Sequence, residues 1–202
     1  SVSKDSKTAE SDIKQIETIF SVIFKFSEEI SDDFDEDTVL NYHCTAFIAL
    51  SGTSVERVKN WIQKLKSENS SKEIKAFCND LKESFITIKK LSELTNKNCP
   101  ITDCLLLNRN SSIPVFLKLY RYNEESETEI QNIAEQIENI LFKLTYTVAD
   151  YRTDNLPGIA LKYQGNIEQL KSELSEIQEA GFQWWWEFSK NCKAYFTDYM
   201  YH

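Results

Sequence analysis

The sequence predicts an all-α protein, an irregular bundle of about seven to ten helices. The chain has 202 residues, of which 41% are hydrophobic, enough to build a core. It contains only four glycines and three prolines, too few for the many tight turns of a β-sandwich or barrel. Apolar residues also recur at three- and four-residue spacing along most of the chain, as they do on one face of a helix.

The first two predicted helices lie in residues 11–31 and 39–50. The first carries a single apolar stripe, and the acidic stretch 31–37 separates it from the second. Apolar residues crowd more than one face of the second, so we expect that helix to be buried. Residues 1–10 are polar, and we expect them to form a disordered tail before a single helical domain, 11–202.

Two capping boxes predict where the next helices begin, because a serine or threonine and a glutamate three residues later bond reciprocally to the backbone. Thr53 with Glu56 begins one helix, and Ser70 with Glu73 begins a long helix that continues to Leu94. The predicted inner face of the helix after Thr53 consists of Val55, Val58, Trp61, Ile62 and Leu65.

Beyond Pro100 the pattern predicts shorter elements and a possible weak subdivision near residue 123. We expect a polar turn at 108–112, with Pro114 in the first turn of the apolar helix after it. Ser126 with Glu129 forms a third capping box. The chain should break at 155–158, form a short helix closed by Gly165, and continue into a helix capped by Asn166.

The most unusual segment is the aromatic C-terminus. Three adjacent tryptophans fan over about 200° of a helix, so they do not share one core face. We interpret this segment as an interface, since tryptophan is enriched in interaction hot spots, and a core helix buried on two sides is the alternative. The candidate interface residues are Trp184, Trp185, Trp186, Phe188, Tyr195 and Tyr199.

Charge and thiol content point to a cytoplasmic protein that does not bind duplex DNA by itself. The formal net charge is −9, which repels polyanions. The sequence has no run of about 18 apolar residues and begins with a polar segment, so we expect neither a membrane span nor a signal peptide. Five irregularly spaced cysteines are typical of free structural thiols, with a Cys99–Cys104 disulfide as the alternative. The only methionine is Met200, so we interpret the chain as a segment of a longer protein.

The residues also lack the patterns of an active site. Two histidines, without CxxC or HExxH, predict no metal site. Asp33, Asp35 and Asp37 alternate as in a calcium loop, but Thr38 occupies the position of the turn glycine, so we prefer an acidic helix boundary. His43 and Cys44 are neighbours on a helix and point about 100° apart, which disfavours a nucleophilic pair. With four glycines, we expect no phosphate-binding loop, no cofactor and no enzymatic activity.

From about residue 20 to residue 165 the order of features resembles the helical region of GmrSD-type modification-dependent restriction endonucleases. The resemblance lies in the pattern of these segments: YHCTAFIAL, VERVKNWIQKL, SSKEIKAFCNDLKESFITIKKLSEL, SSIPVFLKLYRY and IENILFKLTYTVADYRTDN, the last containing Arg152.

In that family an aspartate, glycine, glutamine and arginine motif of the N-terminal domain is linked to nuclease action, and many members add an HNH-type nuclease. Neither motif occurs in this sequence. The resemblance therefore implies a non-catalytic helical scaffold whose partners are other domains of the parent chain or another protein, with nucleic acid bound only through the parent. The alternative is a stand-alone helical binding module or regulator that docks through its aromatic C-terminal helix.

Overall fold

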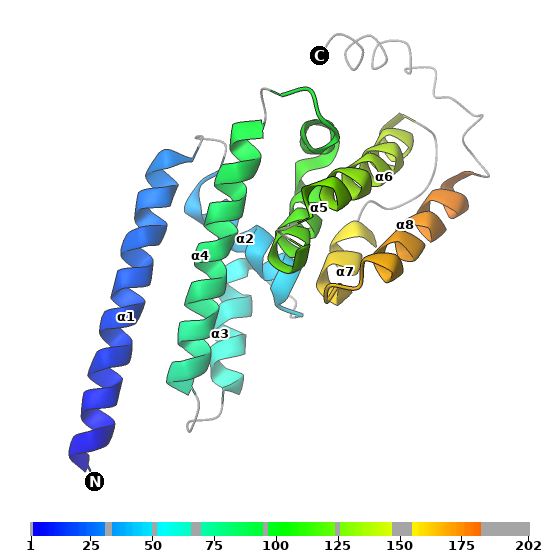
Figure 1. Cartoon of the computed structure of the whole chain (residues 1–202). Helices are drawn as coiled ribbons and strands as arrows, with labels where there is room; N and C mark the ends of the chain where they lie inside the picture. Colours follow the sequence, from blue (N-terminus) through cyan, green and yellow to red (C-terminus); the bar gives the residue numbers. More distant parts are fainter. Residues whose placement is uncertain are drawn as a thin grey trace. The chain divides into compact units, whose positions relative to one another are not determined.

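The computed structural model is all-α over the residues that it describes, which are 2–30, 34–49, 52–65, 70–94, 97–123, 126–146 and 155–182 (Figure 1). These residues form eight α-helices and no strand, which confirms the predicted fold class. The chain divides into two compact units, residues 1–93 (unit 1) and 94–202 (unit 2). This boundary lies before the possible subdivision near residue 123, and the helices on either side of that position pack on each other within unit 2.

Unit 1 contains α1 (Val2–Glu29), α2 (Glu36–Phe47), α3 (Ser54–Lys64) and α4 (Ser70–Leu94). α1 begins at Val2 and so includes most of the segment that the sequence predicts as a tail. Residues 2–10 contain neither glycine nor proline, so no helix breaker separates them from the apolar stripe that follows.

The long helix α4 supplies much of the core of unit 1. Its side chains Ile88 and Leu91 have no exposed surface. Lys89 of the same helix forms an ion pair with Glu29 and lies 5.4 Å from the ring centroid of Phe26, which ties the end of α1 to α4 (Figure 1). The apolar stripe predicted from residue 70 to residue 94 is therefore a single helix, as expected.

Side-chain caps fix the starts of α2 and α3. The Asp35 carboxylate accepts a hydrogen bond of 2.7 Å from the backbone N–H of Thr38, so the acidic stretch does mark a helix boundary. Thr53 and Glu56 form the predicted capping box. Gly52, just before it, has a φ of +112°, a conformation that residues with a Cβ rarely adopt.

The predicted inner face of α3 was only partly right. Val58, Trp61 and Leu65 are half-buried, whereas Val55 and Ile62 are 48% and 44% exposed. Helical geometry explains the difference, because the mean direction of Val55 and Ile62 lies about 80° around the helix from the mean direction of the other three residues. α3 thus presents a narrower apolar face to its unit than the sequence predicts.

Unit 2 contains α5 (Pro100–Asn123), α6 (Glu127–Tyr146), α7 (Asn155–Lys162) and α8 (Ile167–Phe182). α5 is its central helix, and every residue from 111 to 120 is buried. α5 packs against α6 and α7, and α6 also packs against α8 (Figure 1). This arrangement explains why residues 111–120 of α5 are buried on all sides.

The break inside α5 is shorter than the predicted turn at 108–112. Only Asn108 leaves the helical conformation, with φ −159° and ψ 86°. Its side-chain oxygen accepts a hydrogen bond of 3.1 Å from the backbone N–H of Ser111, as an N-cap does. The second part of α5 therefore begins just after Asn108, and Pro114 lies beyond its first turn, contrary to the prediction.

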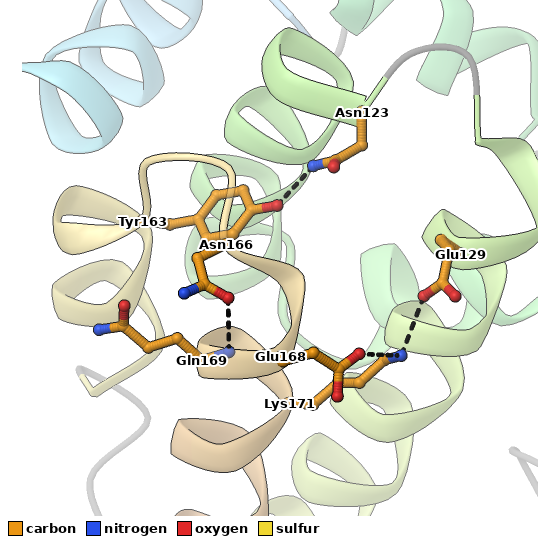
Figure 2. Close-up of polar contacts among 7 residues, drawn as sticks. All are labelled: Asn123, Glu129, Tyr163, Asn166, Glu168, Gln169 and Lys171. Atoms are coloured by element: carbon orange, nitrogen blue, oxygen red, sulfur yellow. Dashed lines mark hydrogen bonds and ion pairs between the residues drawn. The ribbon is translucent and has the colours of Figure 1, made fainter.

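The break predicted at 155–158 was wrong, because α7 begins at Asn155 and runs through it. Pro157 is the third residue of this helix, and a proline in the first turn removes no intrahelical hydrogen bond. Gly165, with a φ of +94°, follows the helix as predicted. The Asn166 side chain then accepts a hydrogen bond of 3.1 Å from the backbone N–H of Gln169, which confirms the cap of α8 (Figure 2).

The other two predicted capping boxes have different outcomes. Ser70 is the first residue of α4 and not the residue before it, so it does not occupy the predicted cap position. Ser126 does occupy that position, immediately before α6, and its carbonyl accepts a hydrogen bond of 3.1 Å from the N–H of Ile130.

None of the described helices combines the length and the apolar character of a membrane span.

Candidate functional site

Unit 1 has an open hollow of about 250 Å³ between α2, α3 and α4. Its lining includes four rings, those of His43, Phe47, Trp61 and Phe77. The carboxyl residues Glu73 and Asp80 line it as well. Most small-molecule sites measure about 300–1,000 Å³, so this hollow fits one side chain or a small headgroup better than a larger ligand.

The four rings form one connected aromatic cluster. The ring centroids of His43 and Phe47 are 4.9 Å apart, those of His43 and Phe77 5.2 Å, and those of Trp61 and Phe77 4.9 Å. Centroid separations of about 4.5–7 Å are those at which aromatic side chains attract one another. Phe47, Trp61 and Phe77 are only half-buried, so the cluster keeps aromatic surface available to an occupant.

A buried hydrogen-bond chain fixes the orientation of the His43 ring. His43 is 1% exposed, and its Nδ1 lies 2.8 Å from the Ser84 hydroxyl oxygen. The same hydroxyl lies 3.2 Å from the carbonyl oxygen of Asp80 one turn earlier on α4. The His43 ring is thus held through Nδ1 against α4, in either of its tautomers. Ser84 is itself only 3% exposed, so we interpret this pair as positioning the ring and not as a nucleophile and its base.

The acidic residues of the hollow share one face of α4. Glu73 and Asp80 are two helical turns apart, so they project on the same side as Phe77. Lys75 and Lys82 lie on the opposite side of the helix by the same geometry. α4 therefore contributes negative charge and an aromatic ring to the hollow, with Lys75 and Lys82 on the other side of the helix.

In unit 2, Lys171 of α8 contacts two carboxylates, as Figure 2 shows. Its ammonium lies 3.1 Å from the Glu129 carboxylate of α6 and 3.1 Å from the Glu168 carboxylate one turn earlier on α8. Hydrogen bonds to both carboxylates raise the pKa of Lys171. This contact links two helices that already pack together, so we interpret it as structural.

Lys118 of α5 is a buried cation of unit 2. It is 2% exposed, and its ammonium donates a hydrogen bond of 3.1 Å to the carbonyl oxygen of Tyr163, just after α7. It also lies 5.5 Å from the ring centroid of Tyr122. Burial lowers the pKa of Lys118. The hydrogen bond to Tyr163 joins α5 to the end of α7. A cation at the carboxyl end of a helix also interacts favourably with the helix dipole.

His43 and Cys44 contact different segments: His43 Nδ1 lies against Ser84 of α4, whereas the Cys44 thiol lies 3.9 Å from the carbonyl oxygen of Ser54 on α3. Cys44 is fully buried, and burial raises its pKa to about 11. Cys44, Cys78, Cys99 and Cys104 are free thiols, so the Cys99–Cys104 disulfide does not form. In the part of the chain that the structure describes, no three His, Cys, Asp or Glu side chains are placed to hold a metal ion.

The candidate interface predicted from the sequence lies outside the described residues. This applies to Trp184, Trp185, Trp186, Phe188, Tyr195 and Tyr199. The hollow of unit 1 is instead a site that sequence reasoning missed. Helical spacing places Glu73, Phe77 and Asp80 on one face of a helix, but carboxylates at the edge of an apolar stripe are common on partly solvated helices and do not by themselves indicate a site.

Comparison of the chain with protein-family models, with curated proteins and with solved structures finds no match.

Proposed function

We propose that the chain is a non-catalytic helical interaction segment that serves as a scaffold in a larger cytoplasmic protein resembling the GmrSD-type defence nucleases. The observation that carries this proposal is the aromatic hollow of unit 1. Aromatic side chains dominate interaction hot spots, which lie in well-packed pockets. Since Phe47, Trp61 and Phe77 are already held against their neighbours, a partner would bury them at a small cost in side-chain entropy.

The engagement of the buried reactive groups supports a non-catalytic role. His43 is bonded to Ser84, and Lys118 to the carbonyl of Tyr163. The Cys104 thiol is fully buried and donates to the carbonyl of Ala134 at 3.3 Å. Each of these side chains joins two segments of its own unit. Each is also buried, so a substrate in solution has no direct access to it.

Assembly with the rest of the parent protein tests the proposal. The segments encoded on either side of this chain are produced as separate polypeptides and mixed with it, and complexes are measured by size-exclusion chromatography with light scattering. We expect a complex that Trp61→Ala weakens at least about tenfold, the effect of losing a hot-spot side chain. Circular dichroism melting of the variant shows whether its helices remain folded.

Two results would contradict the proposal. One is reproducible nuclease or nucleotidase activity of the purified chain with Mg²⁺ or Mn²⁺ that a point substitution abolishes. The other is an assembly that Trp61→Ala leaves intact and Trp184→Ala destroys without loss of folding. The second result would instead support docking through the aromatic C-terminal segment.

A further inference from the structure

We propose that the aromatic hollow of unit 1 binds the side chain of an arginine presented by a basic segment of a protein partner. This inference rests on the proposed function, since it identifies the occupant of the same site. Three features of the hollow carry it: its rings, its carboxylates and its size.

The rings fit a planar cation. A guanidinium group stacks on aromatic faces and is attracted by the ring quadrupole within about 6 Å of the centroid, most strongly by tryptophan. Trp61 and Phe77 are tilted by only 33° from parallel, and both remain half-buried. Both rings line the hollow. An aliphatic occupant would use this surface too, so the rings alone do not select the charge.

The carboxylates select a cation with N–H donors. Glu73 and Asp80 line the hollow from the same face of α4, and the residue between them, Ala76, has only a methyl group and leaves room. A guanidinium donates up to five hydrogen bonds and pairs with carboxylates in bidentate geometry. A quaternary ammonium has no N–H and would leave that capacity unused, so the chemistry of the hollow favours arginine over a methylated amine.

The chain does not fill the hollow with its own neighbouring guanidinium. Arg57, one turn before Trp61 on α3, donates to the carbonyl of Gly52 at 2.9 Å and to the hydroxyl of Thr45 at 3.3 Å. Arg57 is thus engaged with the α2–α3 turn. The net charge of −9 adds a long-range field that draws a basic segment toward the protein. A hollow of about 250 Å³ that opens to solvent admits one side chain while its backbone stays outside.

Titration of the ¹⁵N-labelled full chain with short peptides tests the inference. The probes are acetyl-Gly-Arg-Gly-amide and the same peptide with citrulline, which has nearly the shape of arginine without the charge, with trimethyllysine, or with leucine. The readout is the indole N–H resonance of Trp61, identified by its loss in Trp61→Phe. The double variant Glu73→Gln/Asp80→Asn is compared with Glu17→Gln/Glu93→Gln, which removes the same charge from positions outside the hollow.

We expect the arginine peptide to shift the Trp61 resonance and to bind more tightly than the other three peptides. The hollow double variant should weaken binding roughly threefold to tenfold, the range expected for two partly exposed ion pairs, while the control variant keeps most of the affinity. Equal weakening in the control variant would overturn the inference, as would tighter binding of trimethyllysine or no response to arginine.

Failure of this inference differs from failure of the proposed function. If leucine or citrulline shifts the Trp61 resonance as strongly as arginine does, the hollow remains an interaction site without selectivity for a cation. If no peptide shifts it, the arginine inference is rejected. The proposed function then stands or falls on whether assembly with the flanking segments still depends on Trp61.

Discussion

Lys118 shows how a charged side chain is used inside the buried part of α5. Its ten-residue neighbourhood on α5 is buried throughout, and the ammonium is retained because it donates to the carbonyl that follows α7. A buried acceptor that loses its donor keeps its desolvation cost, which is about 1–3 kcal/mol. The residue therefore stabilises one specific placement of α7 against α5.

Lys118→Met should lower the free energy of unfolding by about 1–3 kcal/mol at neutral pH, because methionine preserves the apolar stem but leaves the Tyr163 carbonyl without its donor. Chemical denaturation followed by circular dichroism measures the change. Lys162→Met is the matched control, since Lys162 is exposed at the end of α7 and its replacement should change stability by less than about 0.5 kcal/mol. Equal losses in the two variants would contradict the role of Lys118.

The pH dependence of this difference has a defined sign. Burial lowers the pKa of Lys118 below its ordinary value of 10.5, so the unfolded chain binds that proton more tightly than the native one. Native stability then rises as the pH increases from the lowered pKa toward 10.5. Since Lys118→Met lacks the group, its deficit relative to the parent chain should widen over this interval, as measured by denaturation at several pH values. Burial raises the pKa of Tyr120 to about 12, so ionisation of Tyr120 in the unfolded chain lowers native stability above pH 10. Both proteins contain Tyr120, so this contribution cancels when their stabilities are compared.

The thiols give a second test at the residue scale. Burial raises the pKa values of Cys44, Cys78 and Cys104, that of Cys44 to about 11, which reduces both access and the thiolate fraction. Cys99 is only half-buried. Brief alkylation of the native protein with iodoacetamide, followed by peptide mass spectrometry, should label Cys99 before these three. Labelling in denaturant should remove the order, and early labelling of native Cys104 would contradict the packing described for α5 and α6.

At the scale of elements, the capping box of α3 matters because this helix has little else to hold it. None of the residues of α3 is fully buried, so packing contributes less to it than to α4 or α5. The Thr53 side chain accepts from the backbone N–H of Glu56 at 3.3 Å, while the Glu56 carboxylate accepts from the N–H of Thr53 at 2.9 Å. Local hydrogen bonds thus define where α3 begins, and α3 carries Trp61 into the hollow.

Thr53→Ala should therefore reduce the free energy of unfolding by about 1 kcal/mol, the usual value of an N-cap. Thr53→Ser keeps the hydroxyl and is the matched control. Thermal and urea denaturation of both variants provide the measurement, and the peptide titration shows whether the Trp61 site is disturbed as well. A serine variant as unstable as the alanine variant would show that the methyl group of Thr53, and not the cap, is responsible.

The same elements show what could be predicted from the sequence. Apolar periodicity and caps depend on neighbours along the chain, so the long helix to Leu94 and the starts at Thr53 and Asn166 were predicted correctly. Pro157 misled the prediction because proline signals a break but is tolerated in a first turn. Local patterns have this ambiguity whenever a breaker falls near a helix start.

The hollow could not be predicted because its walls come from three helices and depend on how these pack. Trp61 and Phe77 belong to ordinary apolar stripes in the sequence, and only their packing leaves them half-buried around an open space. Glu73 and Asp80 are two of 32 acidic residues, so nothing in the composition distinguishes them. Their position beside the rings is a property of tertiary structure.

At the scale of the whole molecule, the net charge makes association with basic partners faster and association with acidic partners slower. The formal net charge of −9 opposes association with any polyanion and favours basic partners, in agreement with the occupant proposed for the hollow. Some of the lysines are already neutralised by carboxylates of the chain: Lys89 is paired with Glu29, and Lys171 with Glu129 and Glu168. Each of these pairs places a carboxylate beside the cation that a phosphate would need.

The chain by itself should consequently show no saturable binding to duplex DNA up to about 10 μM protein at physiological salt, a range in which basic proteins already bind nonspecifically. Fluorescence anisotropy of a labelled duplex measures this, with a basic DNA-binding protein as the positive control. Saturable binding that weakens steeply as salt increases would contradict the expectation, because it would require a local basic surface strong enough to overcome the net charge. Replacing Lys59 and Lys64, both exposed on α3, with glutamine would then determine whether that surface lies beside the hollow.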